Sequence, residues 1–221
     1  MAWDQTWEKI FQSQEWGKYP SEDLIRFIAR NFYQELNRKD VKILEVGCGT
    51  GANLWYIARE GFSVYGIDGS KTAIDKAIDR LNIEVPSWSG NLKVGDIESL
   101  PFENNTFDAV IDVEAIYANN YENSKEIYNE INRVLKIGGK LYSRTFATKC
   151  WGDETGLNIG YNTWIPIVGP LNNKGIARFT AREDIDDLLS NFAIIELEKI
   201  ERTFNRLEEK VIEWIIVGMK K

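Results

Sequence analysis

Histidine is absent from the 221-residue chain, and cysteine occurs only twice. Without histidine there is no Ser-His or Cys-His nucleophile pair, no histidine general base and no histidine metal ligand. The two cysteines, Cys48 and Cys150, form no CxxC metal motif and are too few for a disulfide framework. We therefore expect a protein of a reducing compartment whose chemistry does not depend on histidine.

The chain also lacks a basic excess and any long apolar run. It has 27 Lys and Arg against 34 Asp and Glu, which gives a formal net charge of −7. Nucleic acids and anionic membranes need a positive surface, so we expect neither as a partner. No apolar segment approaches the length of a membrane span, and the acidic N-terminus MAWDQTWEKIF does not resemble a signal peptide. We predict a cytoplasmic protein, a monomer or a homodimer, that binds a small molecule.

The most regular feature of the sequence is an alternation of short apolar segments with helical segments. The apolar segments predict strands at 41–47, 62–68, 91–96, 107–113 and 140–147. Helices are expected at 52–59, 70–81 and 123–135. Such alternation is typical of βαβ units, which build a parallel sheet with helices on both faces.

The two ends of the chain depart from this alternation. Residues 1–38 are rich in aromatic side chains and predict a helical lid, with Ser21 as the cap of a helix to about residue 37. Residues 148–179 predict a long irregular insert that covers a site. Thr180 and Glu183 form a capping box for a helix ending near Ser190, and an antiparallel hairpin is expected at 192–204 and 210–219. We predict one domain over 1–221: a doubly wound, mostly parallel seven-stranded sheet with an antiparallel C-terminal hairpin.

A glycine-rich turn, EVGCGTG at 45–51, follows the first predicted strand. Its glycines let a ligand approach the main chain, and a helix N-terminus follows. The second strand ends on Asp68, 21 residues after Gly47, where an acid suits ribose hydroxyls. The turn satisfies a relaxed dinucleotide fingerprint, so a nicotinamide-dependent oxidoreductase is one alternative. Glu45 would repel a pyrophosphate, however, and no second nucleotide-binding half follows the fifth strand.

Five segments together resemble the ordered motifs of class I S-adenosylmethionine-dependent methyltransferases. They are ILEVGCGTG, VYGIDGS, VGDIESLPF, FDAVIDVEAIY and RVLKIGGKLYSRTF, and they span roughly 41–147. The resemblance implies transfer of a methyl group from S-adenosylmethionine, with S-adenosylhomocysteine as product, to a small-molecule acceptor by in-line displacement. A non-catalytic cofactor-binding protein on the same scaffold is the other alternative.

The resemblance also assigns residues to the cofactor. Asp68 would hold the ribose hydroxyls, Asp96 the adenine amino group, and Ile97 the adenine ring. Asp112 would face the methionine end. The full cofactor set comprises Glu45, Gly47, Cys48, Gly49, Gly51, Asp68, Gly69, Ser70, Asp96, Ile97 and Asp112.

The acceptor would lie beyond the fourth strand, next to Glu114 and Tyr117, which are the candidate catalytic residues. Tyr117 stands where some relatives carry histidine, so it either donates a hydrogen bond or forms a wall; Glu114 either attracts an amine or accepts a proton. The segment RTFATK offers no acid-amide pair after the fifth strand, so no metal is expected. Clustered aromatic side chains suit a mostly apolar or planar acceptor, or the face of a sugar. The candidates for acceptor binding are Trp16, Tyr19, Trp151 and Tyr161.

Overall fold

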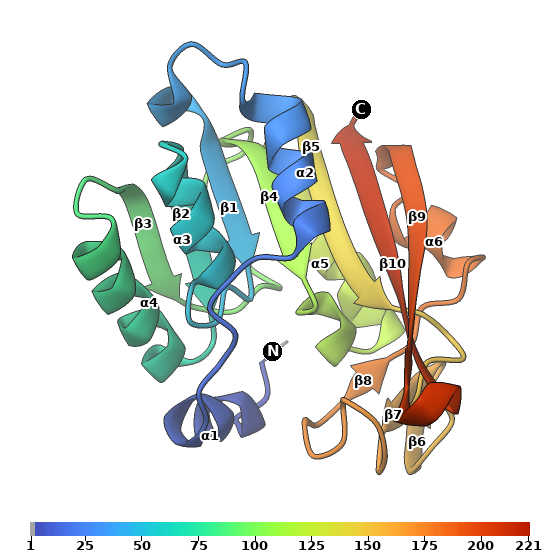
Figure 1. The fold of residues 1–221 in the computed structure, drawn as a ribbon. Coiled ribbons are helices and arrows are strands. Elements are labelled where there is room, and N and C mark those ends of the chain that lie inside the picture. The colour runs from blue at the N-terminus through green and yellow to red at the C-terminus, as the bar shows by residue number, and fades with distance from the viewer. Residues whose placement is uncertain (1–2) are drawn as a thin grey trace.

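A seven-stranded sheet with the strand order β3-β2-β1-β4-β5-β10-β9 forms the centre of the molecule (Figure 1). The computed structural model describes residues 3–221, so the first two residues of the expected lid lie outside the described part of the chain. Strands β1 to β5 run parallel, and β10 is antiparallel to both β5 and β9. The expected mostly parallel sheet with an antiparallel C-terminal hairpin is confirmed. Its strands are β1 (Lys42–Val46), β2 (Ser63–Asp68), β3 (Ser89–Val94), β4 (Phe107–Val113), β5 (Leu135–Phe146), β9 (Phe192–Phe204) and β10 (Glu209–Lys220).

Helices cover both faces of this sheet, as the alternating pattern predicts. Helices α2, α3 and α4 pack on one face, and α5 and α6 pack on the other (Figure 1). The α-helices are α1 (Thr6–Ser13), α2 (Glu22–Phe32), α3 (Ala52–Arg59), α4 (Lys71–Glu84), α5 (Tyr121–Val134) and α6 (Asp184–Leu188). Short 3₁₀ helices are η1 (Arg38–Asp40), η2 (Ile116–Ala118) and η3 (Asn205–Leu207). None of the helices described between residues 3 and 221 has the length and apolarity needed to cross a membrane.

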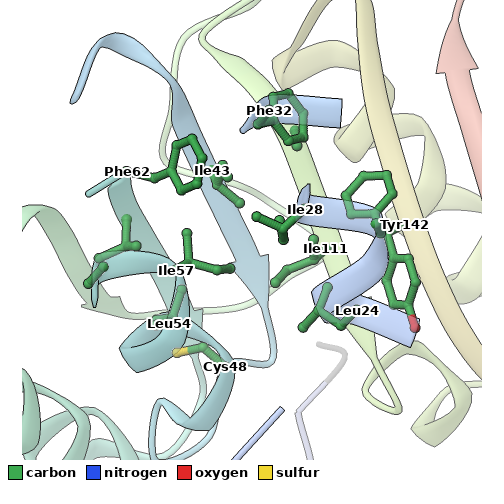
Figure 2. Close-up of a cluster of buried hydrophobic side chains, with 14 of the residues drawn as sticks. Leu24, Ile28, Phe32, Ile43, Cys48, Leu54, Ile57, Phe62, Ile111 and Tyr142 are labelled. Carbon is green, nitrogen blue, oxygen red and sulfur yellow. The ribbon is translucent and has the colours of Figure 1, made fainter. Parts of the chain in front are cut away.

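Buried aliphatic side chains join α2 to the sheet. Leu24 and Ile28 point from α2 toward Ile43 of β1 and Ile111 of β4 (Figure 2). All four side chains are fully buried. Burial of each one stabilises the fold by about 1.5–3 kcal/mol, so the sheet is held rigidly beneath its loops.

Caps fix where the helices after β2 and β4 begin. The Ser70 hydroxyl accepts the Ala73 N–H at 3.0 Å at the start of α4. The Asn120 side chain accepts the Asn123 N–H at 2.9 Å at the start of α5. Because each cap directly follows a loop at the carboxyl end of a strand, it sets the length of that loop.

Three expected local features differ from the structure: the end of a helix, the form of the insert and a helix cap. Helix α2 ends at Phe32 rather than near residue 37. The insert at 148–179 is not irregular, because it forms a three-stranded sheet of β6 (Leu157–Gly160) and β7 (Thr163–Ile165) with β8 (Ala177–Arg178). Thr180 caps no helix: its hydroxyl accepts a hydrogen bond from Arg178, and α6 begins only after Glu183.

Candidate active site

A cavity of about 360 Å³ lies at the carboxyl ends of the parallel strands. Helix α1 and the small sheet of the insert lie at the same end of the large sheet, near the tips of the β1, β4 and β5 arrows (Figure 1). This is where open α/β sheets bind ligands. We call one part the glycine-turn half, lined by Glu45, Gly47, Gly49, Asp68, Gly69 and Ile97. We call the other part the Tyr117 half, lined by Trp16, Glu114, Tyr117, Arg144, Phe146 and Lys174.

The glycine turn follows β1 and has a backbone that only glycine adopts easily. Gly47, Gly49 and Gly51 all have a left-handed φ, of 64°, 50° and 76°. A Cβ on Gly47 would also stand 2.3 Å from the Cβ of Ala115, which belongs to the loop after β4. The glycine at 47 therefore permits two loops to meet at the cavity wall.

Asp68 ties this turn to the end of β2. One carboxylate oxygen accepts the Gly49 N–H and the other accepts the Ser70 N–H, both at 2.8 Å. Burial raises the pKa of Asp68, and the two amide donors oppose that effect. The carboxylate lines the cavity while it anchors both loops, so it serves structure and site together.

Glu45 is a buried carboxylate in the same half. One oxygen accepts a hydrogen bond from the Asn53 amide at 2.6 Å, and the other is buried without a partner among residues 3–221. Burial, with nearby Asp68 and Asp112, raises the pKa of Glu45 to about 8. A buried carboxylate with a free oxygen is suited to a cationic ligand group.

The Tyr117 half contains a charged network. The Arg144 guanidinium donates to both oxygens of Glu213, at 2.9 and 2.6 Å, and lies 3.3 Å from Glu114. Burial and the adjacent Glu213 raise the pKa of Glu114, whereas Arg144 lowers that of Glu213. Of Glu114 and Glu213, Glu114 is therefore the one that is protonated and neutral near pH 7. The backbone of Glu114 has a left-handed φ of 57°.

Tyr117 forms the apolar floor beside this network. Its side chain is only 2% exposed and meets Phe146 edge-on, with ring centroids 4.9 Å apart. Burial raises the pKa of Tyr117, so the phenol stays protonated. Its hydroxyl makes no hydrogen bond to the rest of the described chain.

Asp112 is not among the residues that line the cavity, so its expected contact with the methionine end of a ligand stays a prediction. The carboxylate is fully buried and accepts the Ala115 and Ile116 N–H groups, at 3.0 and 3.1 Å, and the Ser143 hydroxyl at 2.7 Å. Burial raises the pKa of Asp112 to about 6. Its function is to fix the loop that presents Glu114 and Tyr117.

Three other expected cofactor residues, Gly51, Ser70 and Asp96, are not among the residues that line the cavity. Ser70 is fully buried as the cap of α4, and Asp96 lies between the lining residues Gly95 and Ile97, with its carboxylate accepting the Glu98 N–H at 3.0 Å. Gly51 is the N-cap residue of α3.

Cys48 does line the cavity wall. Burial raises the pKa of its thiol well above the ordinary value, so the thiol is not a nucleophile.

Two expected acceptor-binding residues lie away from the cavity. Trp151 packs against Phe204 of the hairpin, with ring centroids 6.4 Å apart. Tyr161 is 58% exposed and donates to Asp184 at 2.9 Å. Tyr161 lies in the turn between β6 and β7 of the small sheet, and the Trp151 N–H donates to the Lys210 carbonyl of β10 at 2.6 Å. Trp16 and Tyr19 do line the cavity, although Tyr19 is largely exposed.

The structure adds cavity residues that the sequence did not single out for a site. Trp7 and Phe11, which with Trp3 form a stripe of three aromatic residues spaced four apart in the sequence, pack with Trp16 at centroid distances of 5.7 and 5.6 Å. Trp3 packs on Gly69, where a Cβ would stand 2.0 Å from the indole. The stripe was the available signal for these three. Nothing local marks Asn53, Arg144 or Lys174.

No group of three or more His, Cys, Asp or Glu side chains in residues 3–221 is placed to hold a metal ion. The polar groups of the residues that line the cavity are instead carboxylates, backbone amides and two cationic side chains. Such a set is suited to an organic ligand with both cationic and hydroxyl groups.

Comparisons with known proteins agree with this arrangement. Residues 44–143 match the family described as "Methyltransferase domain". Over 128 residues the chain is 36% identical to the sterol 24-C-methyltransferase erg-4 of Neurospora crassa, covering 54% of this chain and 32% of that protein. It is 25% identical over 198 residues to the ubiquinone biosynthesis O-methyltransferase of Bartonella tribocorum, covering 84% and 76%. The chain spans only 26–43% of the length of the first curated relatives that it matches.

Among solved structures, a SAM-dependent methyltransferase from Methanosarcina mazei superimposes with a TM-score of 0.69. It is 24% identical, and the match covers 82% of this chain and 93% of that one. This likeness extends the shared fold beyond the segment that matches the family.

Proposed function

We propose that the chain is a class I S-adenosylmethionine-dependent methyltransferase that methylates a small-molecule acceptor, which the family match over residues 44–143 and the shared fold support. When bound, S-adenosylmethionine supplies a methyl group on a cationic sulfur and leaves as S-adenosylhomocysteine after in-line displacement by the acceptor atom. The observation that carries the proposal is that the glycine turn and Tyr117 line one continuous cavity.

The glycine-turn half fits the cofactor by its chemistry. The free oxygen of Glu45 would accept a hydrogen bond from the ammonium of the methionine end. The ion pair so formed would give this buried oxygen the partner that it lacks among residues 3–221. The Asp68 carboxylate would accept ribose hydroxyls. The left-handed glycines would let the cofactor lie against main chain rather than side chains.

Residues of the Tyr117 half would orient the acceptor. The protonated phenol of Tyr117 is free to donate a hydrogen bond to it. Glu114 is neutral near pH 7 and shares its proton with Glu213, so it would position the acceptor by hydrogen bonding rather than remove a proton. Asp96, Ile97, Gly51 and Ser70 keep their cofactor assignments as part of this proposal, Gly51 and Ser70 by supporting the turn and α4.

The acidic charge of −7 supports a small molecule over nucleic acid as the partner, and the free cysteines Cys48 and Cys150 support a reducing compartment such as the cytoplasm. The β9–β10 hairpin occupies the place where a nicotinamide enzyme would carry a second nucleotide-binding half, which supports methyl transfer over hydride transfer.

Calorimetry with S-adenosylhomocysteine and with NAD, followed by a turnover assay with S-adenosylmethionine, tests the proposal. The assay covers a metabolite panel and detects by mass a product 14 Da heavier than its substrate. We expect S-adenosylhomocysteine alone to bind, and Asp68→Asn to weaken its binding about ten-fold or more, because an amide accepts hydroxyl donors less strongly than a carboxylate. Binding of NAD alone would overturn the proposal, and cofactor binding without turnover on any acceptor would favour a non-catalytic protein.

A further inference from the structure

Lys174 is a cavity cation without an anionic partner. It lines the Tyr117 half from the segment between β7 and β8 and is half-buried. Its ammonium lies 5.1 Å from the centroid of the Trp16 ring. No ion pair joins it to a carboxylate of residues 3–221. Burial lowers its pKa, and the Glu114 carboxyl group of the same cavity opposes that effect. A cation–π contact offsets only part of the cost of removing an ammonium from water.

The other cavity charges are already engaged. The Arg144 guanidinium is hydrogen-bonded to Glu213. Glu114, which belongs to the same charged network, is neutral near pH 7. Glu45 and Asp68 belong to the glycine-turn half. The Asp4 carboxylate lies beside Gly175, but it accepts the Thr6 N–H at 2.8 Å and forms no ion pair with Lys174. Lys174 is therefore the charge available to an acceptor.

The walls around Lys174 are apolar or aromatic. Trp7, Trp16, Tyr117, Phe146 and Leu171 all line the cavity. They suit a ligand with an apolar or planar body. A single lysine supplies one positive charge, whereas phosphate groups are usually bound by several donors or by a helix N-terminus. One negative charge on an apolar body matches this half best.

We propose that the methyl acceptor is an apolar or aromatic carboxylic acid whose carboxylate forms an ion pair with Lys174. This inference rests on the proposed function of the same cavity and names the chemical class of its acceptor. Trp16 would lie along the body of the acid while its ring holds the lysine side chain in place.

Paired ligands test this assignment. Benzoate, 4-hydroxybenzoate, indole-3-acetate and octanoate are each titrated by calorimetry against the matching primary amide, with the protein saturated in S-adenosylhomocysteine. We expect at least one acid to bind about ten-fold more tightly than its amide. Lys174→Arg should keep that preference and Lys174→Met should lose it. Lys93→Met is the matched control, because Lys93 lies 5.0 Å over the Phe102 ring but does not line the cavity.

Two results would overturn the inference: equal binding of every acid and its amide by the natural chain, or an acid preference that survives Lys174→Met. Lys174→Gln repeats the test if the methionine variant does not fold. Binding of S-adenosylhomocysteine is measured separately in the same experiment. Failure at that step contradicts the proposed function itself, whereas cofactor binding without an acid preference contradicts only the assignment of Lys174.

Discussion

Glu45 is a cavity residue whose protonation state changes near neutral pH, so ligand binding beside it should depend on pH. Its folded pKa is raised from 4.5 to about 8 because the carboxyl group is buried, so it is mostly protonated near pH 7. The raised value means that ionising Glu45 costs stability as pH rises from 4.5 toward 8. An ammonium group beside the free oxygen would reverse that preference and stabilise the ionised form.

We predict that S-adenosylhomocysteine binding strengthens as pH rises from 6 to 8. Binding of the ammonium requires ionised Glu45, so the affinity should increase by up to about ten-fold per pH unit below the pKa of the free protein. Calorimetry in two buffers of different ionisation enthalpy should detect release of a proton near pH 7.

Glu45→Gln is the control for this prediction. It keeps the hydrogen-bonding shape but cannot ionise, so binding should be weaker at pH 8 and nearly independent of pH. A pH dependence that persists in Glu45→Gln would assign the proton to another group.

At the scale of single residues, the sequence predicted which loops form the site better than it predicted the direction of each side chain. Glu45, Gly47 and Asp68 line the cavity as expected. Asp112 is turned into the loop after β4 by the two amides and the Ser143 hydroxyl. Alternation along a strand identifies a buried carboxylate but not the partners that satisfy it, because Ser143 lies 31 residues away.

Among the secondary-structure elements, α1 adds the aromatic side chains of Trp7 and Phe11 to the cavity lining. Glu8 of α1 accepts hydrogen bonds from the Ser70 and Thr72 hydroxyls at the start of α4, which lower its pKa. The Lys76 ammonium of α4 donates to the Phe11 carbonyl at 2.6 Å. These contacts hold the aromatic side chains of α1 over the glycine turn.

We predict that Glu8→Gln loosens α1 and weakens S-adenosylhomocysteine binding about five-fold, which corresponds to a loss of about 1 kcal/mol in charge-assisted hydrogen bonds. Trypsin should cleave after Lys9 faster than in the natural chain. Glu15→Gln, an exposed acid of the same segment, is the control and should change neither measurement. Unchanged binding in Glu8→Gln would show that α1 does not contribute to the cofactor site.

The elements of the insert were beyond prediction for a physical reason. β6 has four residues and all are exposed, and β7 has only three. Strands this short and exposed lack the alternation of apolar and polar residues that identifies a half-buried strand. The fully buried Arg178 of β8 donates a hydrogen bond to the Thr180 hydroxyl. The capping pattern in the sequence had predicted that this hydroxyl caps a helix.

At the scale of the whole molecule, the alternation predicts that strands β1 to β5 run parallel, whereas it does not predict the contacts around the Tyr117 half. Arg144 and Glu213 lie 69 residues apart and meet only because β10 inserts beside β5. Asp23 of α2 lies 3.5 Å from the same guanidinium, and the exposed Arg202 of β9 lies 3.1 Å from Glu213. One buried network therefore joins α2, the loop after β4, and the terminal hairpin.

We predict that Arg144→Met destabilises the protein by about 3–5 kcal/mol near pH 7, because it leaves the fully buried Glu213 without its main cation. For a chain of this length that corresponds to a fall of about 10 °C in melting temperature. The Glu213 carboxyl group would then have a folded pKa above its unfolded value, because burial raises it and the Arg144 guanidinium no longer lowers it. The penalty is therefore fully present at neutral pH and diminishes as pH falls toward about 4.5. Arg202→Met removes the exposed partner of the same Glu213 and should cost under about 1 kcal/mol. Thermal unfolding of both variants at pH 7 and pH 5 measures the difference, and equal losses in the two would mean that the buried network does not depend on Arg144.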